Sequence, residues 1–190
     1  HNIYLKPFNP RYSPNHPRNR EVISSKGCIT TDQIPEGSAL HTLYDASEFR
    51  DFLCAVLDVG GLYEYADPLS SINLHYASKG QELGWHFDNS SFAVTTLLQE
   101  PESGGIFEYV PEVRDSDTGE MAFDRVDAVL NGAENICQLN FDPGDLVLFR
   151  GRNALHRVTP TEGSVTRVLA VFAYNDEPGV GLSRSALETF

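Results

Sequence analysis

A series of short segments that favour β-strands constrains the fold of this chain more than any other feature. Each segment alternates or is rich in β-branched and aromatic residues, and turns with Gly, Pro or Asp separate one from the next. We expect strands over residues 72–77, 92–98, 105–110, 135–140, 145–149 and 164–174. Short strands with such punctuation indicate a β-sandwich or a β-barrel.

A pattern of two histidines and one aspartate suggests a metal site. His86 and Asp88 are separated by one residue, and His156 follows His86 by 70 residues. On a strand, residues i and i+2 point to the same face, so His86 and Asp88 can bind one ion from one strand end. Two histidines and one carboxylate form the facial triad of non-haem Fe(II) enzymes. A His-x-Asp pair alone occurs by chance in many chains, so this prediction depends on the whole set.

Arg167 lies eleven residues after His156, inside the apolar segment 164–174. The segment would carry the guanidinium inward, where a cation needs a partner. The fork of a guanidinium suits a carboxylate, through two parallel hydrogen bonds. That carboxylate belongs either to an acidic side chain of this protein or to a bound dicarboxylic acid, and the segment alone favours neither.

Together these features resemble the Fe(II)/2-oxoglutarate-dependent dioxygenases of the prolyl-hydroxylase-like type. The resemblance spans about residues 71–176 and rests on residues 76–88, 104–107 and 142–149, with His156 and Arg167. It implies a mainly β fold, the double-stranded β-helix or jelly-roll also seen in cupins, with an N-terminal helix and flanking helical segments.

The resemblance also assigns roles to particular residues. It implies that His86, Asp88 and His156 bind Fe(II). Arg167 and Tyr76 would bind the co-substrate 2-oxoglutarate, and O2 would be the second co-substrate. A core tyrosine with a satisfied hydroxyl explains Tyr76 nearly as well.

Residues 84–95 and 102–109 further resemble a small group of bacterial radical halogenases and hydroxylases that act on free amino acids such as lysine. In the halogenases of that group, glycine or alanine replaces the acidic ligand and frees an iron position for chloride. This chain keeps Asp88. The resemblance therefore implies hydroxylation of an unactivated C–H bond of a free amino acid, with release of succinate and CO2.

Two other functions remain open at this point. The same chemistry would serve on a peptide or protein side chain, and a non-catalytic jelly-roll would bind a small acid or a metal as a sensor. The intact set of ligands argues against the sensor. Asn89, Arg152 and Asn175 are the candidate contacts to the substrate.

Charge and composition limit the classes of partner that we expect for this protein. The net charge of −13 opposes binding to nucleic acid, which depends on lysine and arginine. It permits a basic amino acid as substrate, although plain solubility explains the charge as well. No apolar run reaches the roughly 18 residues that span a bilayer. Three widely spaced cysteines suggest neither disulfides nor a zinc site, so we expect a cytoplasmic protein. The oligomeric state is left open.

The length suits one domain over residues 1–190. Within it, four prolines among residues 1–20 predict an extended arm. Apolar residues at helical spacing predict a supporting helix over residues 45–60, with Asp45 as its N-cap and glycines at its end. The jelly-roll core would occupy residues 71–176. A further short helix is expected after the charged residues 112–120.

Overall fold

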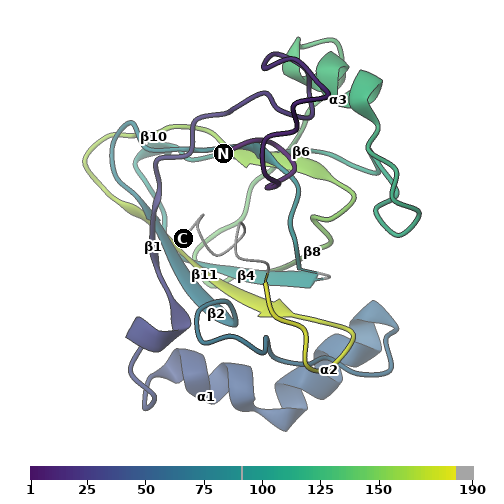
Figure 1. The fold of residues 1–190 in the computed structure, drawn as a ribbon. Coiled ribbons are helices and arrows are strands. Elements are labelled where there is room, and N and C mark those ends of the chain that lie inside the picture. Colours follow the sequence, from purple (N-terminus) through teal and green to yellow (C-terminus); the bar gives the residue numbers. More distant parts are fainter. Residues whose placement is uncertain (91, 183–190) are drawn as a thin grey trace.

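The computed structural model describes residues 1–90 and 92–182, and two antiparallel β-sheets that face each other form its centre (Figure 1). The larger sheet has the strand order β1-β2-β11-β4-β8, the smaller has the order β3-β9-β6-β7, and β5 pairs with β10. The strands are Gly27–Ile29 (β1), Ile72–Ala77 (β2), Leu83–His86 (β3), Phe92–Gln99 (β4), Ser103–Gly104 (β5), Phe107–Val110 (β6), Cys137–Leu139 (β7), Leu146–Phe149 (β8), Leu155–Val158 (β9), Thr161–Glu162 (β10) and Arg167–Tyr174 (β11).

This architecture confirms the predicted mainly β jelly-roll fold. Each of the six predicted segments contains a strand, namely β2, β4, β6, β7, β8 and β11. The strands that the sequence did not delimit are β1, β3, β5, β9 and β10, and none is longer than four residues.

Two helices lie between β1 and β2 where one was predicted. α1 (Ala39–Asp45) and α2 (Ser47–Leu57) are separated by one residue, Ala46. The predicted N-cap is wrong, because Asp45 is the last residue of α1, and Ala46 with its extended backbone begins α2. α2 ends at Asp58, which has a φ of 54° and so reverses the chain before the predicted glycines. Aspartate is one of the few residues besides glycine that adopt this conformation.

Residues 1–20 do not form the extended arm that their prolines predict. The chain reverses through several turns. The side chain of Asn19 links these turns, because its amide group donates hydrogen bonds to the backbone carbonyls of Asn9, Tyr12 and Ser13. Ile3 is fully buried in a hydrophobic cluster that also includes Val126 and Val129 of α3 (Phe123–Leu130), the short helix predicted after the charged residues. Side-chain hydrogen bonds and apolar burial therefore hold this segment against the smaller sheet.

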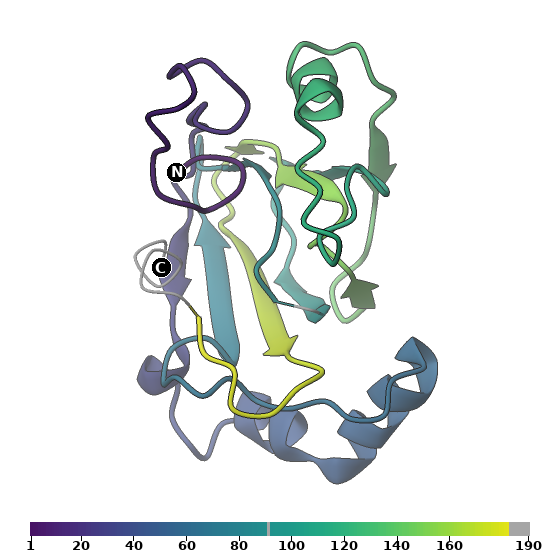
Figure 2. The ribbon, with the colours of Figure 1, turned by 45° about the vertical axis from the view of Figure 1, so that its right-hand side comes forward.

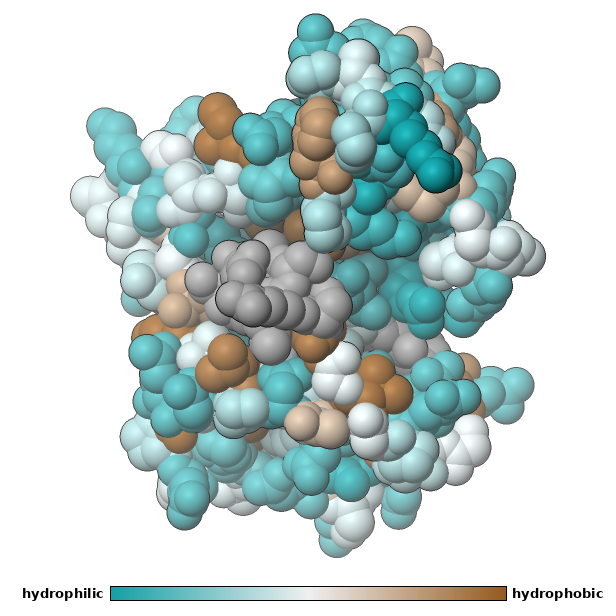
Figure 3. Space-filling view, viewed as in Figure 1, coloured by the Kyte–Doolittle hydropathy of each residue, from teal (hydrophilic) through white to brown (hydrophobic). Residues whose placement is uncertain are grey.

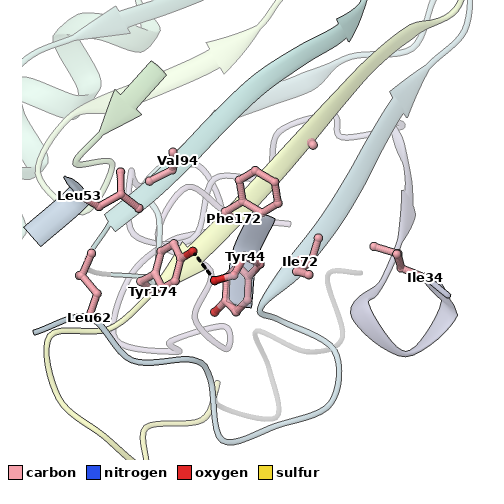
Figure 4. Close-up of a cluster of buried hydrophobic side chains, with 9 residues drawn as sticks. Ile34, Tyr44, Leu53, Leu62, Ile72, Val94, Phe172 and Tyr174 are labelled. Atoms are coloured by element: carbon pink, nitrogen blue, oxygen red, sulfur yellow. Dashed lines mark hydrogen bonds between the residues drawn. The ribbon is translucent and has the colours of Figure 1, made fainter. Parts of the chain in front are cut away.

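The main hydrophobic core lies between the larger sheet and the helices α1 and α2, which cover the sheet face that points away from the smaller sheet (Figures 1 and 2). Figure 4 shows Tyr44 of α1 beside Phe172 and Tyr174 of β11. The rings of Tyr44 and Tyr174 stack, with centroids 4.5 Å apart. The Tyr44 hydroxyl donates to the Ala173 carbonyl at 2.9 Å, and the Tyr174 hydroxyl donates to the Tyr44 carbonyl at 3.3 Å. Both buried hydroxyls are thus satisfied. The other sheet face is left free for a site.

Leu53 provides a test of this packing. Its side chain is 0% exposed, whereas its neighbour Phe52 on the same helix is 50% exposed. Leu53→Ala is expected to lower the free energy of unfolding by about 2–5 kcal/mol, because the cavity cannot fully collapse. Phe52→Ala, the matched control, should change it by no more than about 0.5 kcal/mol. Urea denaturation measures both, and equal effects would contradict the arrangement of α2 on the sheet.

Hydrophilic residues cover most of the face seen in Figure 3, and hydrophobic residues form only small separate groups there. Within the described residues, no helix combines the length and apolar character that crossing a membrane requires. Cys28, Cys54 and Cys137 are all unpaired, so the expected absence of a disulfide framework agrees with the structure.

Candidate metal centre

The predicted ligands His86, Asp88 and His156 meet between the two sheets. His86 ends β3, and its partner in the register of the sheet is His156 on β9. Oδ1 of Asp88 lies 3.6 Å from Nε2 of His86 and 3.4 Å from Nε2 of His156. The three ligand atoms all lie within 4.8 Å of one another. A single ion about 2.0–2.2 Å from each ligand atom fits these separations.

Hydrogen bonds orient both imidazoles. Nδ1 of His86 donates to the carbonyl of Gly84 at 2.8 Å, and Nδ1 of His156 donates to the carbonyl of Ala154 at 3.0 Å. A carbonyl only accepts, so Nδ1 carries the proton in each ring. The Nε2 lone pairs are therefore left to face the shared point, as in metal-binding histidines.

The protonation states also suit a metal site. Burial, together with the neighbouring His156, lowers the pKa of His86 to about 3. Burial by itself would raise the pKa of Asp88, but the charge and hydrogen bond of His156 and the charge of His86 outweigh it and hold this pKa at about 2. At neutral pH His86 is neutral and Asp88 is an anion, the forms that bind metal ions.

Gly151 leaves the space that the carboxylate of Asp88 occupies. The backbone N–H of Asp88 donates to the carbonyl of Gly151 at 3.0 Å. A Cβ atom at Gly151 would lie 1.9 Å from Oδ2 of Asp88 and 2.8 Å from Cε1 of His156. Only glycine fits at this position. The constraint comes from a contact across the fold, so nothing local in the sequence reveals it.

A first pocket opens beside the triad, and Arg167 borders it. The side chain of Arg167, at the start of β11, is 5% exposed. Burial lowers its pKa to about 10, so it remains charged at neutral pH. Within the described residues no carboxylate forms an ion pair with it. Of the two interpretations left open by the sequence, the internal salt bridge is thus absent from the described part of the chain. The pocket offers an uncompensated cation to an acidic ligand.

The side chain of Tyr76 does not lie on the same sheet face as that of Arg167, although both residues border the first pocket. In the sheet Arg167 pairs with Ala77, whereas Tyr76 pairs with Val168. Successive side chains on a strand point to opposite faces. The side chain of Tyr76 therefore lies on the far face, 39% exposed and with its ring against Gly27. The register places this side chain on the opposite face from Arg167, and the contact between the Tyr76 hydroxyl and the co-substrate stays a prediction.

His75 and Thr95 also border the first pocket. The side chain of His75 points to the opposite sheet face from that of its neighbour Tyr76. His75 pairs with Leu169, two residues from Arg167 on the same strand face. Burial lowers the pKa of His75 well below its usual value, so the ring is neutral at pH 7. Among the described residues, the group of three that can hold a metal does not include His75.

A second pocket shares His75, His86 and Asp88 with the first and is lined mainly by polar residues, among them Asn89. Asn175 is 5% exposed, and its Nδ2 atom has no hydrogen-bond partner in the described part of the chain. Arg152 borders neither pocket, and its guanidinium lies 3.9 Å from the carboxylate of Asp117. Of the three predicted substrate contacts, only Asn89 lines the pocket.

Three other residues near the triad have structural roles. Trp85 and Phe87 lie in the hydrophobic cluster behind the smaller sheet, as their alternation with the ligands predicts. Glu108 accepts hydrogen bonds from Arg157 at 2.6 Å and Gln138 at 3.0 Å. Its carboxylate is thus already occupied on the outer face of the sheet.

The fold is shared with solved oxygenase structures. A 2OG-Fe(II) oxygenase family oxidoreductase from Burkholderia pseudomallei has a TM-score of 0.56 and 13% identity, over 82% of this chain and 67% of that one. AviO1 from Streptomyces viridochromogenes Tue57 has a TM-score of 0.60 and 16% identity, over 82% of this chain and 69% of that one. At such low identity, the likeness establishes the fold alone.

The family follows from the sequence. The model of the family described as HalD, halogenase D, matches residues 11–186. The chain therefore belongs to the halogenase D family. No curated protein matches it. Membership agrees with the predicted resemblance to radical halogenases and hydroxylases, and the substrate must be argued from the pockets.

Proposed function

We propose that this protein is an Fe(II)- and 2-oxoglutarate-dependent oxygenase that hydroxylates an unactivated C–H bond of a free amino acid, releasing succinate and CO2. His86, Asp88 and His156 would hold the iron, and Arg167 would hold the distal carboxylate of 2-oxoglutarate. One observation supports this most: a group of two imidazoles and one carboxylate that can hold a metal shares a pocket with a buried arginine that has no ion-pair partner within the described residues.

Bound iron, with 2-oxoglutarate and O2, would supply the oxidising power needed to break a C–H bond. The chain supplies position and surroundings. A facial triad leaves the opposite side of the ion open. The guanidinium fork of Arg167 would orient the co-substrate by two parallel hydrogen bonds. Phe107, Phe149 and Val158 give the first pocket apolar walls that limit the entry of water.

Asp88 favours hydroxylation over halogenation. The halogenases that the chain resembles have glycine or alanine at this position. Here the carboxylate lies between the two imidazoles, and its low pKa keeps it charged. A chloride ion would have to displace a charged ligand, so we assign the protein to the hydroxylases of its family.

The test is anaerobic reconstitution with Fe(II) and 2-oxoglutarate, followed by addition of O2 and measurement of succinate with each of the free amino acids. We expect one amino acid to stimulate succinate formation and to gain an oxygen atom, and not chlorine, when chloride is present. Activity that no amino acid stimulates would instead favour a peptide or protein substrate. Absence of any succinate would favour the non-catalytic sensor.

A further inference from the structure

We propose that Lys26 binds a carboxylate of the primary substrate beside the triad, and that this substrate has a non-basic side chain. The inference rests on the proposed function and specifies which end of the substrate the protein recognises.

The position of Lys26 directs its side chain between the sheets. Lys26 precedes β1, in which Cys28 pairs with His75 of β2. Residues i and i+2 share a strand face, so Lys26 lies on the face of Cys28 and His75. Lys26 borders both pockets, whereas Arg167 borders the first and not the second. The ammonium group therefore stands where the two pockets join.

Lys26 has no counter-charge in the described part of the chain. Burial lowers the pKa of its ammonium group, and no carboxylate there forms an ion pair with it. Glu82 borders the first pocket and accepts a hydrogen bond from the Lys26 backbone at 3.2 Å, yet the two side chains form no ion pair. An unpaired cation in a partly buried position is destabilising, and a bound anion would compensate for it.

A count of charges assigns that anion to the substrate and not to the co-substrate. 2-Oxoglutarate carries two negative charges. Fe(II) with Asp88 contributes one net positive charge and Arg167 contributes another, so these groups already balance the co-substrate. The positive charge of Lys26 is therefore not needed to neutralise the co-substrate. It also faces the second pocket, where no other lysine or arginine is found among the described lining residues.

The rest of the second pocket combines uncharged polar side chains with apolar ones. Tyr65 borders it, and burial raises the pKa of its hydroxyl to about 12, so the group is a neutral donor. Among the described lining residues, Asp88 is the only acid. Because Asp88 belongs to the triad, none of them remains to pair with the ammonium group of a lysine side chain.

The first experiment does not depend on the identity of the substrate. Lysines are labelled by reductive ¹³C-methylation in protein loaded with Ni(II) and 2-oxoglutarate, and acetate is added while NMR spectra are recorded. We expect a saturable shift of the Lys26 resonance, assigned with Lys26→Gln, and no saturable shift for exposed Lys79. Acetamide should have no effect. A Lys26 resonance that does not respond to acetate would overturn the proposal.

The second experiment titrates the same loaded protein with the free amino acids and their carboxamides by calorimetry. We expect a non-basic free amino acid to bind, and its amide to bind at least about tenfold more weakly. Lys26→Gln should lose the same factor, Lys26→Arg should regain most of it, and Lys79→Gln should match the wild type. Unchanged binding by Lys26→Gln, a loss confined to 2-oxoglutarate, or tightest binding of lysine or arginine would each refute it. If no amino acid binds the wild type, the proposed function fails, and the acetate titration still decides the role of Lys26.

Discussion

Replacing Arg167 by methionine is expected to remove 2-oxoglutarate binding while the fold is kept. The guanidinium is buried, charged and without an ion-pair partner in the described part of the chain. Removing one member of a buried charge pair costs about 2–5 kcal/mol. The dissociation constant of 2-oxoglutarate for the Ni(II)-loaded protein should therefore rise by about 30-fold to several thousand-fold, as measured by calorimetry.

The same substitution should not destabilise the protein without ligand. A buried cation that lacks a partner is unfavourable, so an apolar side chain of similar length relieves that cost. We expect the Tm of Arg167→Met without ligand to equal or exceed that of the wild type. Arg11→Met, on the exposed surface, should change neither Tm nor affinity. An undiminished affinity in Arg167→Met would show that the co-substrate lies elsewhere, and a lower Tm would show that Arg167 supports the fold.

The sequence revealed six of the strands because their alternation and turn residues are local properties. It did not reveal β9, which carries His156, because Leu155–Val158 has two polar residues in succession between apolar ones and so shows no alternation. It placed a cap at Asp45 because the local motif is correct, but a preceding helix already uses that residue. In each case the missing information was the contact with another part of the chain.

The residues of the site also divide into those that a local pattern reveals and those whose position depends on contacts with distant parts of the chain. The metal ligands and Arg167 were found because their residue types and spacing are distinctive. Tyr76 borders the first pocket, but the face on which its side chain lies depends on the strand register, because a shift of one residue moves a side chain to the other face of a sheet. His75 and Lys26 border the pocket because β1 and β2 pair in one particular register. No sequence pattern specifies that register.

Gly151→Ala is expected to disrupt the metal centre without a change in any ligand. The added Cβ would lie 1.9 Å from Oδ2 of Asp88, so the carboxylate must move away from the two imidazoles. Losing a group that positions metal ligands typically lowers metal affinity by about 10–100-fold. Competition with a fluorescent chelator measures the affinity for Ni(II). Gly37→Ala is the matched control, because an added Cβ there meets no atom within 4 Å.

The two substitutions should differ in their response to excess metal, and this difference tests the organisation of the whole site. In Gly151→Ala, 2-oxoglutarate affinity falls only because less metal is bound, since Arg167 is unchanged. Saturating Ni(II) should then restore much of that affinity. In Arg167→Met the metal is already bound, so added Ni(II) should restore nothing. If saturating metal rescued both variants, or neither, the triad and the arginine would not be the two separate halves of one co-substrate site.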